Sequence, residues 1–184
     1  MTYSLDETID CVGPKVVSRR LTLSHIRSVN ELFQRRVTIW DNLNANDYDQ
    51  RRLCLGPFSG RSTSIAPELN GLLINPNCEF ELNFVALNTL GQWIRSLPVD
   101  QCDTSIDQVD SWLQSALVDW LPELNAETAD TTTDDNPSKL TIDELTLLVH
   151  LFYLPYEHGW RAQQMFNEFQ WLRIHHHGST PVSD

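Results

Sequence analysis

The hydrophobic residues up to Trp40 predict a strand, a helix and a second strand. Ile9 to Val12 is a short apolar run that ends at Gly13-Pro14, and Val37 to Trp40 is a β-branched run typical of a buried strand. Between them, apolar residues lie on one face of a helix that Thr22 or Ser24 could cap; they are Ile26, Val29 and Phe33. Because short links join these elements, we expect a βαβ unit with parallel strands.

A further strand and helix are predicted in the middle of the chain. Leu72 to Ile74 is a brief apolar run that follows a long loop broken by glycine and proline. Asn77 can cap the next helix, with Glu79 and Glu81 in a first turn where anions are favoured. This helix should bury an apolar face made of Phe80, Phe84, Leu87 and Ile94. We expect its Trp93 in the core.

An amphipathic helix and a polar linker come next. Ile106 to Leu121 places apolar residues at helical spacing, with aspartates on the other side, and Pro122 should end the helix. Residues 122–139 are rich in Thr, Asp, Asn and Pro and lack apolar periodicity. This composition predicts a flexible acidic linker.

Two more helices are predicted after the linker. Thr141 and Glu144 form a capping box before a helix that Pro155 and Gly159 interrupt. Its buried face should comprise Leu145, Leu148, Val149 and Phe152. A last helix, Trp160 to Ile174, should bury Ala162, Met165, Phe169 and Leu172. Residues 175–184, which open with three histidines, are expected to form a disordered tail and not a metal site.

Composition and charge exclude several classes of partner. The formal net charge of the 184 residues is -12, which argues against direct binding to nucleic acid or to an anionic membrane surface. The sequence has neither an apolar run that could span a bilayer nor a secretory signal. Its four cysteines form no Cys-x-x-Cys pair, so we expect free thiols in a reducing compartment and no zinc site. No cofactor is expected.

The loop after Trp40 is the strongest candidate for a ligand site. Six of the next nine residues carry amides or carboxylates: Asp41, Asn42, Asn44, Asn46, Asp47 and Asp49. These side chains could hydrogen-bond a hydroxyl-rich ligand while Trp40 forms an apolar wall. The alternative is a plain turn beside a tryptophan that packs in the core.

Several motifs, in the same order along the chain, resemble those of the O-GlcNAcases. These are β-N-acetylglucosaminidases of glycoside hydrolase family 84, which remove GlcNAc from Ser and Thr. The matching segments include Gly-Pro-Lys-Val-Val-Ser from Gly13, Trp-Asp-Asn from Trp40, and Ala-Asn-Asp-Tyr-Asp-Gln from Ala45. Five more follow in order: Leu-Gly-Pro from Leu55, Gly-Arg-Ser from Gly60, Asn-Pro-Asn-Cys-Glu-Phe-Glu from Asn75, Leu-Phe-Tyr-Leu-Pro-Tyr-Glu-His-Gly from Leu151, and Glu-Phe-Gln-Trp-Leu-Arg from Glu168.

The resemblance implies an α/β fold: the C-terminal portion of a (β/α)₈ TIM barrel followed by α-helical stalk segments. Residues 1–95 would be the last part of the barrel and 106–121 the first stalk helix. Residues 122–139 would be the linker and 140–174 the stalk helices. Two or three strands alone leave open sheet edges, so we expect the chain to be part of a larger protein.

In this family the acetamido group of the substrate acts as nucleophile, assisted by two adjacent aspartates. Asp134-Asp135 is the sole such pair here and lies in the predicted linker, so no catalytic residue is assigned. The resemblance implies substrate binding by Trp40 against the acetamido methyl, by Asn42 near it, and by Asp47 and Asn75 at the far hydroxyls. Asp41, Asp49 and Arg52 are weaker candidates that should shape the loop.

The implied substrates are O-GlcNAc-modified proteins of the nucleus and cytoplasm. Family members also form homodimers through their stalk helices, and the stripes at Trp112–Leu121 and Leu145–Phe152 are suitable surfaces. Ordinary helix packing within the chain explains these stripes equally well. The alternatives to a hydrolase are a non-catalytic sugar-binding or stalk-mediated interaction fragment and an acidic interaction protein without a sugar site.

Overall fold

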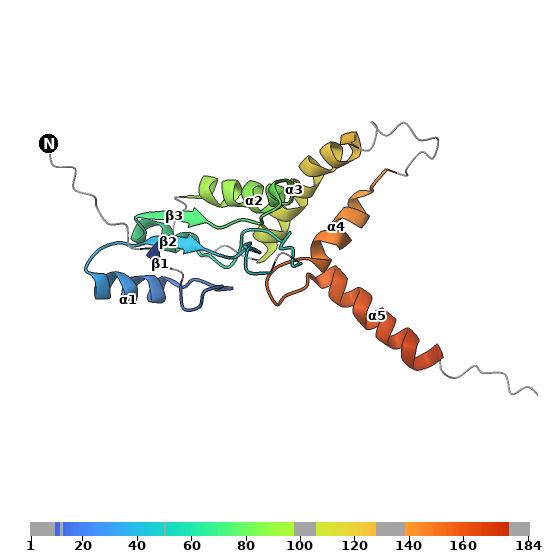
Figure 1. Ribbon diagram of the computed structural model, residues 1–184, viewed down its shortest axis with the longest axis horizontal. Helices are drawn as coiled ribbons and strands as arrows, with labels where there is room; N and C mark the ends of the chain where they lie inside the picture. Colours follow the sequence, from blue (N-terminus) through green and yellow to red (C-terminus); the bar gives the residue numbers. More distant parts are fainter. Residues whose placement is uncertain (1–9, 12, 50, 98–105, 128–138, 177–184) are drawn as a thin grey trace, which may run out of the picture.

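Three short parallel strands lie side by side in the computed structural model, which describes residues 10–11, 13–49, 51–97, 106–127 and 139–176 (Figure 1). They are β1 (Asp10–Cys11), β2 (Thr38–Asp41) and β3 (Gly71–Ile74). Their order in the sheet is β1-β2-β3, and both pairings are parallel. Strands that neighbour each other in chain order and run parallel are typical of a (β/α)₈ arrangement.

Helix α1 (Leu23–Phe33) connects β1 to β2 and confirms the predicted βαβ unit. Thr22 caps it, because its hydroxyl accepts a hydrogen bond from the His25 backbone N–H (3.3 Å). Ile26 is fully buried, and the Asn30 side chain bonds the Val37 backbone N–H (3.0 Å) at the entrance to β2. The helix is thereby held against the start of the central strand.

Helix α2 (Phe84–Arg95) follows the 3₁₀ turns η1 (Thr63–Glu68) and η2 (Phe80–Asn83) and begins later than predicted. Asn77 does not cap it. The Asn77 Oδ1 accepts from the Cys54 backbone N–H (3.0 Å), and its Nδ2 donates to Cys54 O (3.0 Å). A side chain that satisfies both groups of a distant loop residue is unavailable to the helix end.

The buried face of α2 also differs from the predicted one. Phe80, Leu87 and Ile94 are exposed, with 81%, 46% and 52% of their surface accessible. The buried residues are Val85, Ala86, Thr89 and Trp93, so the prediction for Trp93 is confirmed. Apolar residues occur all around this helix, and periodicity alone therefore did not identify the side that meets the core.

Helix α3 (Ile106–Glu127) packs against α2 and continues through Pro122, contrary to prediction. A proline removes the hydrogen bond to the carbonyl four residues earlier, here that of Val118. Val118 is 60% exposed, so water can reach this part of the helix. The opposite face carries the predicted buried residues, which are Trp112, Leu113, Ala116, Leu117 and Trp120.

Helices α4 (Ile142–Leu151) and α5 (Trp160–His176) complete the described chain. The Thr141–Glu144 capping box is present as predicted. On α4 the buried residues are Leu145, Thr146, Val149 and His150, whereas Leu148 and Phe152 are 40% exposed. Every helix within the described ranges is too short or too polar to cross a lipid bilayer.

Helix α5 extends away from the sheet (Figure 1), and this corrects the prediction for its apolar face. Ala162 is fully buried, but Phe169 and Leu172 are 61% and 48% exposed. The helix also includes His175 and His176, which were assigned to the disordered tail. The remainder of the tail (177–184) and most of the linker, with Asp134-Asp135, lie outside the described residues, while residues 122–127 belong to α3.

Candidate functional site

The four residues that the family resemblance implies as sugar-binding form one hydrogen-bonded cluster at the carboxyl ends of β2 and β3. Asn42 Oδ1 accepts from Trp40 Nε1 (2.9 Å) and from Asn75 Nδ2 (3.1 Å). Asn75 Nδ2 also lies 3.3 Å from Asp47 Oδ2. Trp40 is 40% exposed and Asp47 is exposed, so the cluster presents an aromatic face and a carboxylate to solvent.

The parallel register of the strands explains why these residues meet. Trp40 pairs with Leu73 and Asp41 with Ile74, so Asn75 follows β3 at the level where Asn42 follows β2. The Asn75 backbone N–H donates to Asp41 O (2.8 Å) and extends this register by one residue. Side chains 33 positions apart in the sequence are thus placed within hydrogen-bonding distance.

Asp41, a weaker candidate for sugar contact, is buried. Both oxygens accept from Arg61: Nε lies 2.6 Å from Oδ2 and Nη2 lies 2.5 Å from Oδ1. Oδ1 also accepts from the Leu43 backbone N–H (3.0 Å). The side chains of the pair are 1% and 2% exposed. Asp41 therefore holds the strand end in place, and its predicted contact with sugar does not fit this burial.

Arg61 received no role in the sequence analysis, yet it organises the base of the site. Beyond the bidentate pair with Asp41, its guanidinium donates to the carbonyls of Ser18 (2.8 Å), Arg19 (3.0 Å) and Ser59 (2.9 Å). It lies next to Gly60, whose φ of +75° is readily available only to glycine. Gly-Arg-Ser was noticed as a family motif, but nothing in the sequence indicated that its arginine is buried.

The inner amides of the loop serve as a scaffold. Asn44 Nδ2 donates to Gly56 O (3.1 Å), and Asn46 Nδ2 donates to Arg52 O (2.9 Å). Asp49 pairs with Arg52, whose Nε lies 3.2 Å from Asp49 Oδ2. A hydrogen bond from the Arg51 backbone N–H lowers the pKa of the Asp49 carboxyl. As predicted, Asp49 and Arg52 shape the loop.

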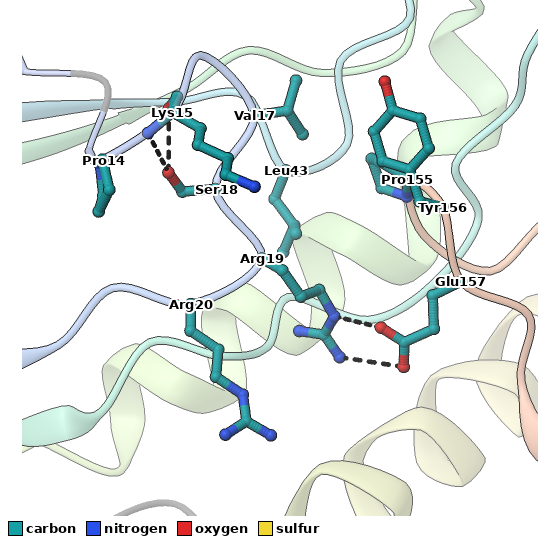
Figure 2. Close-up of a pocket in the computed structure, with 10 residues that line it drawn as sticks. All are labelled: Pro14, Lys15, Val17, Ser18, Arg19, Arg20, Leu43, Pro155, Tyr156 and Glu157. Atoms are coloured by element: carbon teal, nitrogen blue, oxygen red, sulfur yellow. Dashed lines mark hydrogen bonds and ion pairs between the residues drawn. The ribbon is translucent and has the colours of Figure 1, made fainter.

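A cavity of about 430 Å³ opens beside the cluster (Figure 2). Its walls come from the segment 14–20, from Leu43 and from the turn 155–157 that follows α4. Arg19 and Glu157 face each other across it as an ion pair. Two segments far apart in the sequence thus meet next to the loop that carries Asn42.

The segment after α4 is also joined to the long loop by backbone hydrogen bonds. The Leu55 N–H donates to Phe152 O (2.7 Å), and the Gly56 N–H donates to Tyr153 O (2.5 Å). Tyr153 and Leu154 belong to the buried core. The α4–α5 region is therefore packed against the loops that surround the candidate site.

Comparison with known proteins points to one family. The family described as NAGidase, beta-N-acetylglucosaminidase, matches residues 1–125. The protein O-GlcNAcases of Rattus norvegicus and Mus musculus are each 55% identical to this chain over 84 residues, which is 46% of this chain. The chain spans 9% of the length of these curated relatives.

A solved structure of a mutant O-GlcNAc hydrolase from Thermobaculum terrenum supports the same relationship. It matches 90% of this chain and 33% of its own chain, with a TM-score of 0.55 and 26% sequence identity. From its sequence and its fold, this chain belongs to the β-N-acetylglucosaminidases of glycoside hydrolase family 84.

Proposed function

We propose that this chain is the sugar-binding part of an O-GlcNAcase: the C-terminal portion of a (β/α)₈ barrel with the start of a helical stalk. The observation that carries the proposal is the hydrogen-bonded cluster of Trp40, Asn42, Asp47 and Asn75. A ligand pocket at the carboxyl ends of parallel strands is the usual arrangement in barrel enzymes. The substrates would be O-GlcNAc-modified proteins of the nucleus and cytoplasm.

Each member of the cluster has a distinct proposed role. The half-exposed ring of Trp40 would contact the acetamido methyl, an apolar group suited to an aromatic wall. Asn42 would hold that ring through its bond to Nε1 and contact the same end of the sugar. Asp47 would accept hydrogen bonds from the far hydroxyls, while Asn75 holds the Asp47 carboxylate through Oδ2.

Replacing Asp47 by alanine is the direct test of the sugar site. We expect it to weaken binding of a GlcNAc-oxazoline mimic by about tenfold to a hundredfold, because hydrogen bonds to a charged group are lost. Asn75→Ala should have a smaller effect, since a neutral amide contributes less. Isothermal titration calorimetry on the purified chain measures both. Asp119→Ala, which removes an exposed carboxylate on α3, is the matched control and should bind as wild type.

Affinity unchanged by Asp47→Ala would contradict the assignment. Hydrolysis of a chromogenic GlcNAc glycoside tests separately whether this chain is catalytic on its own. We propose that the catalytic aspartates lie outside this chain, so the purified chain should bind the mimic without cleaving the glycoside. Turnover by the chain alone would show that it holds a catalytic acid we have not identified.

We also propose that the stalk helices mediate homodimerisation. The predicted stripes on α3 and α4 pack inside the chain: Trp120 stacks on Phe84 at 5.8 Å, and Leu145 and Val149 are fully buried. Exposed apolar residues are also present on α5, where Phe166, Phe169, Trp171 and Leu172 are 43%, 61%, 58% and 48% exposed. Such a surface on one helix is typical of a protein interface.

Sedimentation equilibrium tests this interface. Wild type should sediment as a dimer, and Phe169→Glu combined with Leu172→Glu should produce a monomer, because both exposed apolar contacts become charged. Leu32→Glu combined with Phe33→Glu, at exposed positions on α1, is the control and should leave the dimer intact. A wild-type chain that stays monomeric at tens of micromolar would overturn the proposal.

A further inference from the structure

The cavity (Figure 2) lies next to the proposed sugar site along the chain, although none of the four cluster residues lines it. Leu43, one of its wall residues, follows Asn42 in the loop. The segment 14–20 on the opposite wall is tied to the same asparagine, because Asn42 Nδ2 donates to Val16 O (2.8 Å). The cavity wall and the cluster are therefore tied to the same loop.

Apolar groups and a closed ion pair form most of the cavity wall. Pro14, Val17 and Pro155 supply rigid or branched apolar surface. Arg19 is bound by Glu157 and also donates from Nη1 to Ser59 Oγ (3.2 Å). Its charge is thus neutralised within the protein, and the pair braces the segment 14–20 against the turn 155–157.

Tyr156 lies at the rim and is 84% exposed. Its φ of +63° is unusual for a residue with a side chain. The Arg52 guanidinium lies 5.6 Å from the centre of its ring, so the ring is positioned beside the polar loop. An exposed aromatic ring held at a rim is well suited to contact a polypeptide backbone.

The two other cations of the wall have no carboxylate partner in the described ranges. Lys15 and Arg20 are both exposed, and neither makes a salt bridge to a described residue. In Figure 2 the Arg20 guanidinium extends from the wall without a drawn contact. The chain as a whole carries a net charge of -12, so this wall is a local exception to its acidic character.

We propose that this cavity is a subsite for an acidic side chain of the polypeptide that carries the GlcNAc. The proposal rests on the proposed function, because the sugar must sit at Trp40 for its polypeptide to pass over the cavity. Lys15 and Arg20 would attract a carboxylate within a few residues of the glycosylated Ser or Thr. Pro14, Pro155 and Tyr156 would contact the peptide backbone between the sugar and this carboxylate. Arg19 would remain paired with Glu157.

Paired glycopeptides test this charge preference. Two nine-residue peptides carry one central O-GlcNAc-serine and differ in having Glu or Lys at the two positions on either side. Fluorescence anisotropy with the 184-residue chain should show the Glu peptide binding about fivefold to tenfold tighter, since each Lys replaces attraction by repulsion. The preference should shrink as salt is raised, because exposed charges are screened.

Charge reversal at the cavity should abolish or invert the preference. Lys15→Glu combined with Arg20→Glu is the test variant. Arg35→Glu combined with Arg36→Glu is the matched control, because it changes net charge equally at two exposed arginines that precede the amino end of β2. The control should keep the wild-type preference, and the GlcNAc-oxazoline mimic should bind both variants equally well.

Binding of the GlcNAc-oxazoline mimic distinguishes failure of the proposed subsite from failure of the proposed sugar site. If the mimic binds wild type while the Glu and Lys peptides bind equally, the subsite is refuted and the sugar site stands. If both charge-reversed variants lose the preference to the same extent, net charge and not the cavity selects the peptide, and the subsite is again refuted. If the mimic does not bind wild type at all, the proposed function itself fails and the subsite with it.

Discussion

Replacing Arg61 by alanine should lower the free energy of unfolding by about 3–5 kcal/mol, because it leaves the Asp41 carboxylate buried without its counter-charge. Asp41 and Arg61 are 2% and 1% exposed, so water cannot readily take over the lost contacts. The substitution also removes the donors to the carbonyls of Ser18, Arg19 and Ser59. Two loops and the end of β2 would then lose their common partner.

Urea denaturation followed by tryptophan fluorescence measures this change. Arg27→Ala is the matched control, because the Arg27–Glu68 pair (2.9 Å) is at the surface, with 62% of the arginine side chain exposed. Exposed pairs of this kind contribute about 0–1 kcal/mol. Asp41→Ala combined with Arg61→Ala should cost less than the two single changes added together. A loss below about 1 kcal/mol for Arg61→Ala would mean that the ion pair does not hold this site together.

Gly56→Ala should destabilise the chain by about 3 kcal/mol and loosen α4 and α5 from the rest. A Cβ at this position would collide with the Tyr153 carbonyl oxygen and lie 2.8 Å from Leu154 Cγ. Overpacking of this kind typically costs about 1–3 kcal/mol. The backbone bonds from Leu55 to Phe152 and from Gly56 to Tyr153 would be lost or lengthened too, at about 1 kcal/mol each.

Gly91→Ala is the control that separates this steric effect from the general effect of replacing glycine. Gly91 lies inside α2, and its Cβ would meet only the end of the flexible Arg95 side chain, at 3.5 Å. Alanine should therefore stabilise the helix there by about 0.5–1 kcal/mol. Amide hydrogen exchange would show faster exchange in α4 for Gly56→Ala alone. Unchanged exchange and stability in Gly56→Ala would contradict the tight backbone contact.

Local signals predicted several parts of this structure correctly. The β-branched run at Val37 and the apolar run at Leu72 became neighbouring parallel strands, with β2 shifted by one residue. Thr22 and the Thr141–Glu144 box cap their helices. These features depend on residues within a few positions of one another, so a short stretch of sequence contains the information.

Features that depend on distant partners were predicted poorly. Asn77 bonds Cys54 instead of capping a helix, α3 continues through Pro122, and α5 leaves Phe169 exposed. In each case the local structure depends on which distant segment packs against the residue, or on whether water reaches it. A periodic pattern shows that a helix has an apolar side, but not whether another element covers it.

The sequence by itself determined the family, the strands and the caps at Thr22 and Thr141, and it proposed the residues of the candidate site, because these rest on residue types in a short and specific order. Only the tertiary structure decided that Asn42, Asp47 and Asn75 meet while Asp41 turns inward to Arg61. Only it revealed the cavity between residues 14–20 and 155–157. The physical reason is that strand register and the pairing of buried charges are free-energy balances over the whole fold, in which each residue's role depends on partners far away in the chain.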